Sequence, residues 1–359
     1  MYPALTVAEQ FADAHDEVLF VGTPDGLESR LVPASGVPFR ALAASGFDRA
    51  RPLTLVASSV RIAISTVRAW RWLGREHFDV VIGFGGYVSI PVGFAALLRH
   101  RPLVLHEQNS VPGLANRVLS RWARAVGVTY EESIGGLKRP ERAVVTGNPV
   151  RPVVLAANRG RGRDALAVGS DDIVLVVFGG SRGARHLNAA MVGLRERLLG
   201  ISRLHIVHVA GKAEAESVRA ALFSAGGDGG GRWRVLDYVE DMGPLLAAAD
   251  LVVARAGATS IAEITALGLP AVLVPYPYAT DDHQTKNAAT MVAHGAAALV
   301  PDAELDEERF GDILVGLLGD PGRRASMAAA SRSLGRPDAA RRVADLARQA
   351  ADASSRPNH

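Results

Sequence analysis

A run of six apolar residues followed by a glycine-rich turn lies near the middle of the chain: Ile173-Val174-Leu175-Val176-Val177-Phe178-Gly179-Gly180-Ser181-Arg182-Gly183-Ala184. The β-branched residues predict a buried strand over 173–178, and the pattern behind the turn predicts a helix over 183–199. This order of strand, glycine turn and helix is typical of a parallel sheet covered by helices. The backbone N–H groups of the turn and the Ser181 hydroxyl are suited to hold a phosphate group.

The same alternation extends through the chain in both directions. Before this run, strands are predicted over 17–22, 80–83, 103–106, 125–128 and 143–146, and helices over 3–14, 53–76, 90–99 and 112–123. After it, strands over 204–210, 233–236, 251–254 and 271–275 alternate with helices over 212–225, 241–248, 258–267 and 284–295. Two such series predict two doubly wound α/β domains.

The boundary between the two series is predicted near Pro149 and Pro152, which are followed by a polar stretch. We therefore expect one domain over 1–150 and a second over 151–336. Residues 337–359 are expected to form a helix that returns to the first domain, followed by a frayed tail. The length of 359 residues agrees with two domains, because one hydrophobic core usually stops growing at roughly 250–300 residues.

Composition and charge exclude several classes of protein. Lys and Arg number 40 and Asp and Glu 37, a net charge of +3, which is too balanced for a dedicated nucleic-acid-binding protein. Cysteine is absent, which excludes disulfides, thiolate catalysis and cysteine metal sites. Residues 80–98 carry no charge and are long enough to span a bilayer. Their glycines and Pro91 instead predict a strand, a turn and a helix.

Two polar or glycine-rich stretches follow predicted strands of the first series. Gly83-Phe84-Gly85-Gly86-Tyr87 could bring backbone N–H groups to an anion, or could be a tight turn that needs positive φ angles. His106-Glu107-Gln108-Asn109 has four polar side chains in a row at the carboxyl end of a strand. Open parallel sheets bind ligands at this edge, so we favour a ligand site there. A lone histidine does not indicate a metal.

Two further stretches follow strands of the second series. Over 255–263, either Thr259 or Ser260 could cap a helix whose free N–H groups stabilise a diphosphate. Glu263 could then accept hydrogen bonds from ribose hydroxyls, or could complete a capping box. The polar residues over 281–287 suit sugar recognition. The glycine spacing near 180 does not match G-x-G-x-x-G, which disfavours NAD as a ligand.

The predicted helix over 53–76 has both apolar and basic character. Val60, Ile64 and Val67 recur at helical spacing, and Arg61, Arg68 and Arg75 recur every seven residues. Trp70, Arg71 and Trp72 lie between them. Tryptophan beside arginine is typical of a surface on anionic lipid, but a helix that covers a sheet with a solvated basic face has the same pattern.

Taken together and in this order, these stretches resemble one family, the MurG glycosyltransferases of peptidoglycan synthesis. The matching stretches are Gly83-Phe84-Gly85-Gly86-Tyr87-Val88-Ser89, His106-Glu107-Gln108-Asn109, Thr146-Gly147-Asn148-Pro149-Val150-Arg151, and residues 179–184, 255–263 and 281–287. The similarity runs from Tyr2 to about Ala351. It implies the GT-B fold, two Rossmann-like doubly wound domains facing across a cleft.

The resemblance implies a hexosyltransferase that moves N-acetylglucosamine, with inversion, from UDP-N-acetylglucosamine to the C4 hydroxyl of the undecaprenyl-linked muramyl-pentapeptide lipid. It implies no divalent ion and no cofactor, no nucleic-acid partner, and a peripheral location on the cytoplasmic face of the bacterial cell membrane. The substrate-binding residues that it implies are Asn109, Arg151, Ser181, Val239, Ala258, Thr259, Ser260, Ile261, Ala262, Glu263 and Gln284. The membrane-contact residues that it implies are Arg61, Ile64, Arg68, Trp70, Arg71, Trp72 and Arg75.

One departure from the family concerns the catalytic base. The family has a strand and a glycine-rich loop before the counterpart of Tyr2, and that loop carries the histidine often proposed as base; this sequence does not contain it. His106 and Glu107 are the remaining candidates near the expected cleft. The alternatives are an impaired protein that binds a UDP-sugar, another GT-B transferase and, more remotely, an NAD-dependent dehydrogenase.

Overall fold

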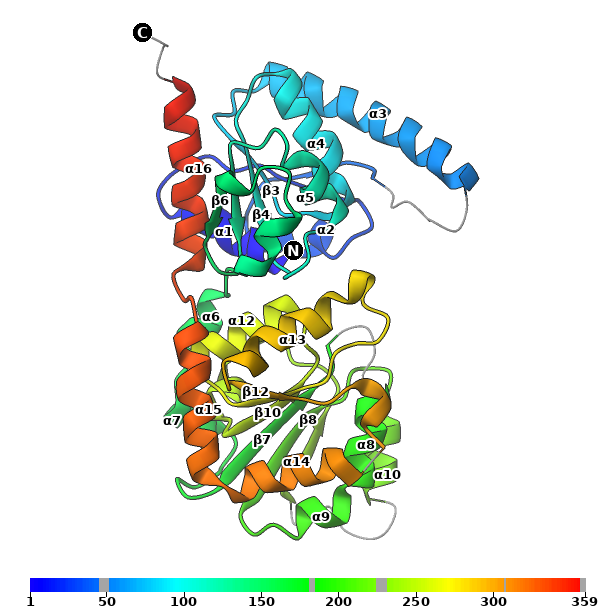
Figure 1. Cartoon of the computed structure of the whole chain (residues 1–359), viewed down its shortest axis with the longest axis vertical. Helices are drawn as coiled ribbons and strands as arrows, with labels where there is room; N and C mark the ends of the chain where they lie inside the picture. Colours follow the sequence, from blue (N-terminus) through cyan, green and yellow to red (C-terminus); the bar gives the residue numbers. More distant parts are fainter. Residues whose placement is uncertain (45–51, 181–184, 224–230, 307, 356–359) are drawn as a thin grey trace. The chain divides into compact units, whose positions relative to one another are not determined.

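The computed structural model describes residues 1–44, 52–180, 185–223, 231–306 and 308–355, and it divides into two compact units (Figure 1). Unit 1 comprises Met1–Pro149 together with the C-terminal residues from Asp338, and unit 2 comprises Val150–Pro337. Each unit is built from parallel strands and helices, so the predicted α/β fold class with two parallel-sheet domains is confirmed.

Unit 2 contains a six-stranded parallel sheet in the order β12-β11-β10-β7-β8-β9. Its strands are β7 (Ile173–Phe178), β8 (Leu204–Val209), β9 (Trp233–Leu236), β10 (Leu251–Ala254), β11 (Ala271–Leu273) and β12 (Ala297–Leu299). The first strand of the unit, β7, is central and pairs with β8 on one side and β10 on the other. The carboxyl ends of the strands therefore meet along one edge.

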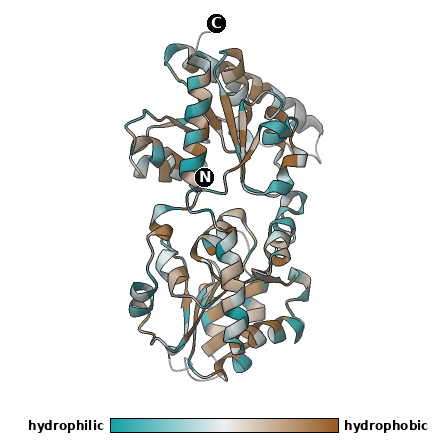
Figure 2. Cartoon of the chain, turned by 60° about the vertical axis from the view of Figure 1, so that its left-hand side comes forward, coloured by the Kyte–Doolittle hydropathy of each residue, from teal (hydrophilic) through white to brown (hydrophobic). Residues whose placement is uncertain are grey.

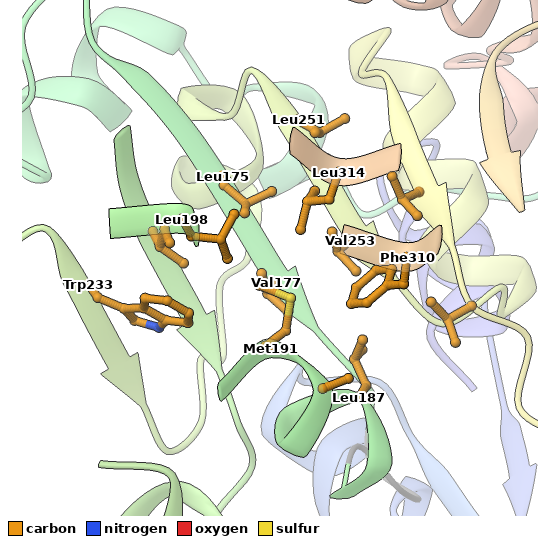
Figure 3. Packing of buried hydrophobic residues seen from close by; sticks show 14 of the residues in the cluster. Leu175, Val177, Leu187, Met191, Leu198, Trp233, Leu251, Val253, Phe310 and Leu314 are labelled. Atoms are coloured by element: carbon orange, nitrogen blue, oxygen red, sulfur yellow. The ribbon is translucent and has the colours of Figure 1, made fainter. Parts of the chain in front are cut away.

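Both faces of this sheet are covered, because alternate residues of β7 point to opposite sides. Leu175 and Val177 pack with residues of α8 (Arg185–Gly193), α9 (Arg195–Leu199), α10 (Ala215–Phe223) and α14 (Glu308–Gly319). Figure 3 shows these two side chains among Leu187, Met191, Phe310 and Leu314. Val174 and Val176 pack with α11 (Gly243–Ala248), α12 (Ala258–Leu267) and α13 (His283–Ala293) on the other face.

Unit 1 contains two separate parallel sheets. The first pairs β1 (Phe20–Gly22) with β2 (Phe39–Ala41). The second has the order β3-β4-β5-β6, with β3 (Val81–Gly83), β4 (Leu103–Glu107), β5 (Ala125–Val128) and β6 (Ala143–Val145). Its main helices are α1 (Tyr2–Ala12), α3 (Pro52–Arg75), α4 (Gly86–Leu98), α5 (Leu114–Leu119) and the C-terminal α16 (Ala339–Ser355), which packs on α1.

The smaller elements complete the chain. Unit 1 also has α2 (Glu28–Ala34) and the 3₁₀ turns Glu131–Gly136 and Pro140–Arg142. Unit 2 also has α6 (Pro152–Leu155), α7 (Arg159–Ala165), α15 (Pro321–Leu334) and the 3₁₀ turns Thr280–Asp282 and Asp302–Glu304. The strands of both units are predominantly hydrophobic, as their brown colour in Figure 2 shows, which is typical of parallel strands covered on both faces.

Most predicted elements are confirmed, several with the expected bounds. Strands β5, β7, β9 and β10 and helix α12 begin and end at the predicted residues. Residues 80–98 form β3, a glycine turn and α4, as predicted. The short strands β2 and β12 and the helices α2, α14 and α15 were not predicted. Within the described part of the chain, no helix has both the length and the apolar character needed to cross a membrane.

Candidate functional site

The start of α12 lies at the carboxyl edge of the unit 2 sheet, two loop residues and a cap after β10. Its N-cap is Gly257, in extended conformation (φ −68°, ψ 143°), and no side chain caps the helix. The prediction that Thr259 or Ser260 is the cap is wrong, because the helix already begins at Ala258. The first intrahelical bond runs from Ile261 N to Gly257 O at 3.0 Å. The preceding N–H groups are directed to the helix end, where an anion is stabilised.

Glu263 lies in the second turn of α12 and pairs with Arg151. The residue is only 5% exposed. Its Oε1 accepts from Arg151 Nε at 3.0 Å and forms an ion pair with Nη2 at 2.9 Å. Arg151 also donates through Nη1 to Glu240 O at 3.0 Å. Burial raises the pKa of Glu263, and the neighbouring guanidinium opposes that rise. The partner of Glu263 is therefore an arginine 112 residues away rather than a capping box.

Val239 lies in a loop of unit 2, and Gln284 lies in a helix of the same unit. Val239 is half-buried and precedes Glu240, whose carbonyl binds Arg151. Gln284 lies in the first turn of α13 and accepts from Tyr276 N at 2.9 Å, which fixes its amide behind β11. The structure thus joins Arg151, the 239–240 loop and Glu263 through direct contacts. Ser181 lies outside the described residues.

An ion network at the same edge, buried at Arg255 and open to solvent at Asp306, was not predicted from the sequence. Arg255 follows β10 and is 6% exposed; its guanidinium donates to Asp302 Oδ1 at 2.5 Å and to Pro275 O at 3.2 Å. The other oxygen of Asp302 accepts from His186 Nδ1 at 2.8 Å, and His186 Nε2 contacts Asp306 at 3.0 Å. Asp302 therefore joins the segment before α12 to the first turn of α8. The one sequence signal was the arginine directly behind an apolar strand.

In unit 1, Glu107 organises the turn that follows β4. It is buried and its Oε1 accepts from Asn109 N at 3.0 Å. Its Oε2 accepts from Gly113 N at 3.0 Å and from Asn116 Nδ2 at 2.8 Å. The carboxylate thereby fixes both the backbone of Asn109 and the start of α5, since Gly113 is the N-cap of that helix.

His106 is fully buried beside Glu107 and is held at both ring nitrogens. Its Nε2–H donates to Gly147 O at 2.9 Å, and its Nδ1 accepts from Gln108 Nε2 at 3.3 Å. Burial lowers the pKa of His106 to about 4, so the ring is neutral at pH 7. The histidine connects β4 to the turn behind β6.

The glycine turn behind β3 needs its glycines for conformation. Gly85 has φ +78° and Gly86 has φ +73°, angles that other residues rarely adopt. Gly85 is the N-cap of α4, and Gly86 is its first residue. This agrees with the tight-turn alternative.

Helix α3 of unit 1 exposes an apolar stripe. Val60, Ile64 and Val67 are 53%, 50% and 48% exposed, and Arg61, Arg68, Arg71 and Arg75 are exposed on the same helix. Trp70 is 38% exposed and lies under the Arg99 guanidinium, 3.7 Å from the ring centre. Trp72 is half-buried against the cluster of Leu42, Ala69 and Leu73, with Arg40 over its ring.

Comparisons with known proteins agree across the chain. Residues 1–128 match the glycosyltransferase family 28 N-terminal domain, and residues 174–343 match the corresponding C-terminal domain. The chain is 39% identical to the UDP-N-acetylglucosamine--N-acetylmuramyl-(pentapeptide) pyrophosphoryl-undecaprenol N-acetylglucosamine transferase of Desulforudis audaxviator, over 99% of this chain and 96% of that protein. The identically named protein of Salinibacter ruber is 40% identical over 96% of this chain and 92% of its own length.

Solved structures with a similar fold include a MurG protein. The crystal structure of Acinetobacter baumannii MurG superposes with a TM-score of 0.75 at 30% identity, covering 97% of this chain and 95% of that one. A UDP-N-acetylglucosamine 2-epimerase from Listeria monocytogenes, described as putative, has a TM-score of 0.68 at 16% identity, covering 95% of this chain and 90% of that one. At that identity the likeness concerns the fold alone.

Proposed function

The chain belongs to the MurG family within glycosyltransferase family 28, and on this premise we propose that it transfers N-acetylglucosamine from UDP-N-acetylglucosamine to N-acetylmuramyl-(pentapeptide) pyrophosphoryl-undecaprenol. The proposal rests on the relatives that carry this activity in their names over nearly the full chain. The observation that carries the donor site is the start of α12, where uncapped N–H groups precede the buried pair of Arg151 and Glu263.

We place the UDP moiety along the carboxyl edge of unit 2. The N–H groups of Ala258, Thr259 and Ser260 and the dipole of α12 would stabilise the diphosphate. Ile261 and Ala262 continue this turn toward Glu263. The hydrogen bond and the ion-pair contact of Glu263 with Arg151 both involve Oε1, so among the described residues Oε2 has no hydrogen bond and would be available to ribose hydroxyls. The backbone of Val239 would meet the uracil, and Gln284 the sugar.

The transfer itself is a displacement at the anomeric carbon. The C4 hydroxyl oxygen of the acceptor forms the new glycosidic bond, the bond from the anomeric carbon to the phosphate oxygen breaks, and UDP departs with the electron pair. Donors that are already oriented at the helix end stabilise the charge that develops on the diphosphate, which is electrostatic preorganisation. The hydroxyl proton passes to a base; we assign it to neither His106 nor Glu107, because the contacts described above hold both side chains in place.

We also propose that unit 1 contacts the membrane and binds the lipid acceptor. The stripe of Val60, Ile64 and Val67 on α3, flanked by exposed arginines, suits a helix that lies on an anionic lipid surface. Trp70 and its partner Arg99 would lie at the headgroup level. This supports a peripheral location on a membrane, and we propose that it is the cytoplasmic face of the bacterial membrane, where the lipid acceptor would be reached.

The donor site is tested by calorimetric binding of UDP-N-acetylglucosamine to the native chain and to Glu263→Gln. The amide keeps the volume of the carboxylate but leaves Arg151 without its charged partner, so we expect the affinity to fall about tenfold or more. Glu216→Gln changes an exposed glutamate of the same unit and should bind like the native chain. Equal binding by E263Q would contradict the donor site, whereas binding without transfer to the lipid acceptor would contradict the transferase alone.

A further inference from the structure

Segments behind four neighbouring strands of unit 2 are linked through the carboxylate of Asp302. The sheet places β12, β11, β10 and β7 side by side in this order. Asp302 lies behind β12, Pro275 behind β11 and Arg255 behind β10. His186 lies in α8, the helix that follows β7. Asp302 contacts Arg255 and His186, and Arg255 also donates to Pro275 O. One carboxylate behind an edge strand is therefore linked to the segments behind the three strands beside it.

Arg255 carries this link into the proposed donor site. It lies two residues before Gly257, the N-cap of α12, so its side chain anchors the segment that leads into that helix. Its guanidinium also lies 5.6 Å from the centre of the Tyr276 ring. Tyr276 N in turn donates to Gln284, the residue that we place at the sugar. The position of Arg255 thus affects both the start of α12 and the segment that holds Gln284.

Asp302 is enclosed and uses both of its oxygens in these contacts. Its side chain is 14% exposed; Oδ1 accepts from Arg255 and Oδ2 from His186. Burial raises the pKa of Asp302, but the hydrogen bonds from His186 and Arg255 outweigh it, so the pKa lies below its ordinary value of 3.8. The carboxylate is therefore ionised at neutral pH and forms charge-assisted bonds. A neutral side chain here would withdraw a charged partner from the buried guanidinium.

We propose that Asp302 is a positioning residue for the donor diphosphate, because it holds the start of α12 in register with the first turn of α8. The inference rests on the proposed function and adds a residue that touches neither the nucleotide nor the sugar. Backbone N–H groups at a helix end stabilise an anion only in the direction in which they are held. Fixing them before the donor binds lowers the cost of ordering them on binding.

The test compares UDP with uridine in the native chain and in Asp302→Asn, with affinities taken from titrations followed by NMR. Uridine keeps the base and the ribose but has no phosphate. We expect D302N to lower the affinity for UDP about fivefold or more, and the affinity for uridine by less than about twofold. Equal losses for both ligands would overturn the proposal, because they would indicate a general disturbance of unit 2. Unchanged affinity for UDP would overturn it as well.

Asp306→Asn is the matched control. Asp306 contacts the other ring nitrogen of His186 from a side chain that is 75% exposed. D306N therefore removes the same negative charge from this edge but leaves the bond between Asp302 and Arg255 intact. Loss of a negative charge by itself favours an anion, and it does so in both variants. We expect D306N to bind UDP at least as tightly as the native chain; a loss equal to that of D302N would contradict the proposal.

Two further variants separate geometry from folding. Asp302→Glu keeps a carboxylate for Arg255, so it should recover the UDP affinity to within about threefold of the native chain; no recovery would count against the proposal. His186→Gln breaks the link to α8 at a half-buried side chain. It should lower the affinity for UDP about twofold to threefold and leave uridine unchanged. It takes the place of D302N if that variant does not fold.

The outcome for the native chain separates this inference from the function on which it rests. A native chain that binds neither UDP nor UDP-N-acetylglucosamine would contradict the donor site and the role of Asp302 together. Native binding that E263Q weakens and D302N does not would contradict the role of Asp302 alone.

Discussion

At the scale of single residues, one carboxylate of unit 2 joins the segment before α12, which the proposed donor site uses, to the start of α8. Asp302 accepts from Arg255, which precedes α12, and from His186, which lies in the first turn of α8. Because Arg255 is buried, its charge requires such a partner. The side chain of Asp302 thus sets the distance between the starts of two helices that begin at the same edge of the sheet.

We expect His186 to make stability depend on pH. The hydrogen bond to Asp302 contributes most to raising the pKa of His186 above its ordinary value of 6.5, and the hydrogen bond to Asp306 contributes next. A raised folded-state pKa means that the stabilisation is complete below about pH 6.5 and is lost as the pH rises through the raised value. His186→Gln should therefore lower the melting temperature of unit 2 by about 1–3 °C at pH 6, and by less at pH 9.

His294→Gln provides the control for this measurement. His294 is an exposed histidine of the same unit, and its Nδ1 contacts Thr290 O. It should shift the melting temperature little, and equally at both pH values. A loss in H186Q that grows toward pH 9 would contradict the assigned direction.

At the scale of elements, α12 presents a helix end to a ligand, whereas α3 presents a helix face. The end of α12 is defined by backbone geometry, since the extended Gly257 leaves the first N–H groups uncapped by any side chain. The face of α3 is defined by exposure, since Val60, Ile64 and Val67 lie on the solvent side while Ala69 and Leu73 face the core. The first feature suits a small anion and the second an extended surface.

We predict that α3 mediates binding to anionic phospholipid vesicles. Ile64→Asp removes half-exposed apolar surface from the stripe and adds a charge of the wrong sign, so vesicle partitioning should fall about tenfold. Partitioning of the native chain should also weaken at high salt, because the flanking arginines act through electrostatics. Co-sedimentation with vesicles measures both effects. Leu27→Asp alters a residue that is 59% exposed at α2 and should partition normally; a similar loss there would argue against a specific role of α3.

At the scale of the whole molecule, the two units differ in how completely their sheets are joined. Unit 2 has one continuous sheet of six strands between two apolar layers. Unit 1 has two sheets and a cavity of about 1880 Å³ beside them. Each unit has hydrophobic core clusters of its own, so each can unfold in a separate transition.

We expect unit 1 to unfold at lower urea concentration than unit 2. Three of the four tryptophans, Trp70, Trp72 and Trp122, lie in unit 1, so fluorescence reports mainly on that unit, whereas far-ultraviolet circular dichroism reports on both. The fluorescence midpoint should precede the late dichroism transition by about 1 M, or about 2 kcal/mol at an m-value of about 2 kcal/mol/M. Trp233→Phe removes the remaining reporter and should leave the early transition unchanged. Coincident transitions would show that the units unfold together.

The local elements of this protein follow from short-range features of its sequence. Strands such as β7 and β10 and helix α12 have predictable bounds because apolar runs and glycines specify them within a few residues. The family was identifiable for the same reason, since its stretches lie in the turns behind these strands.

Contacts between residues far apart in the sequence depend on how the whole chain packs. Strands β2 and β12 were not predicted, and each forms along the edge of a neighbouring strand: β2 pairs with β1, and β12 pairs with β11. Glu263 finds Arg151 across 112 positions, and His186 finds Asp302 across 116. Such pairs form because the carboxyl ends of parallel strands meet at one edge of the sheet. Residues that follow different strands are therefore packed together there, whatever their separation along the chain.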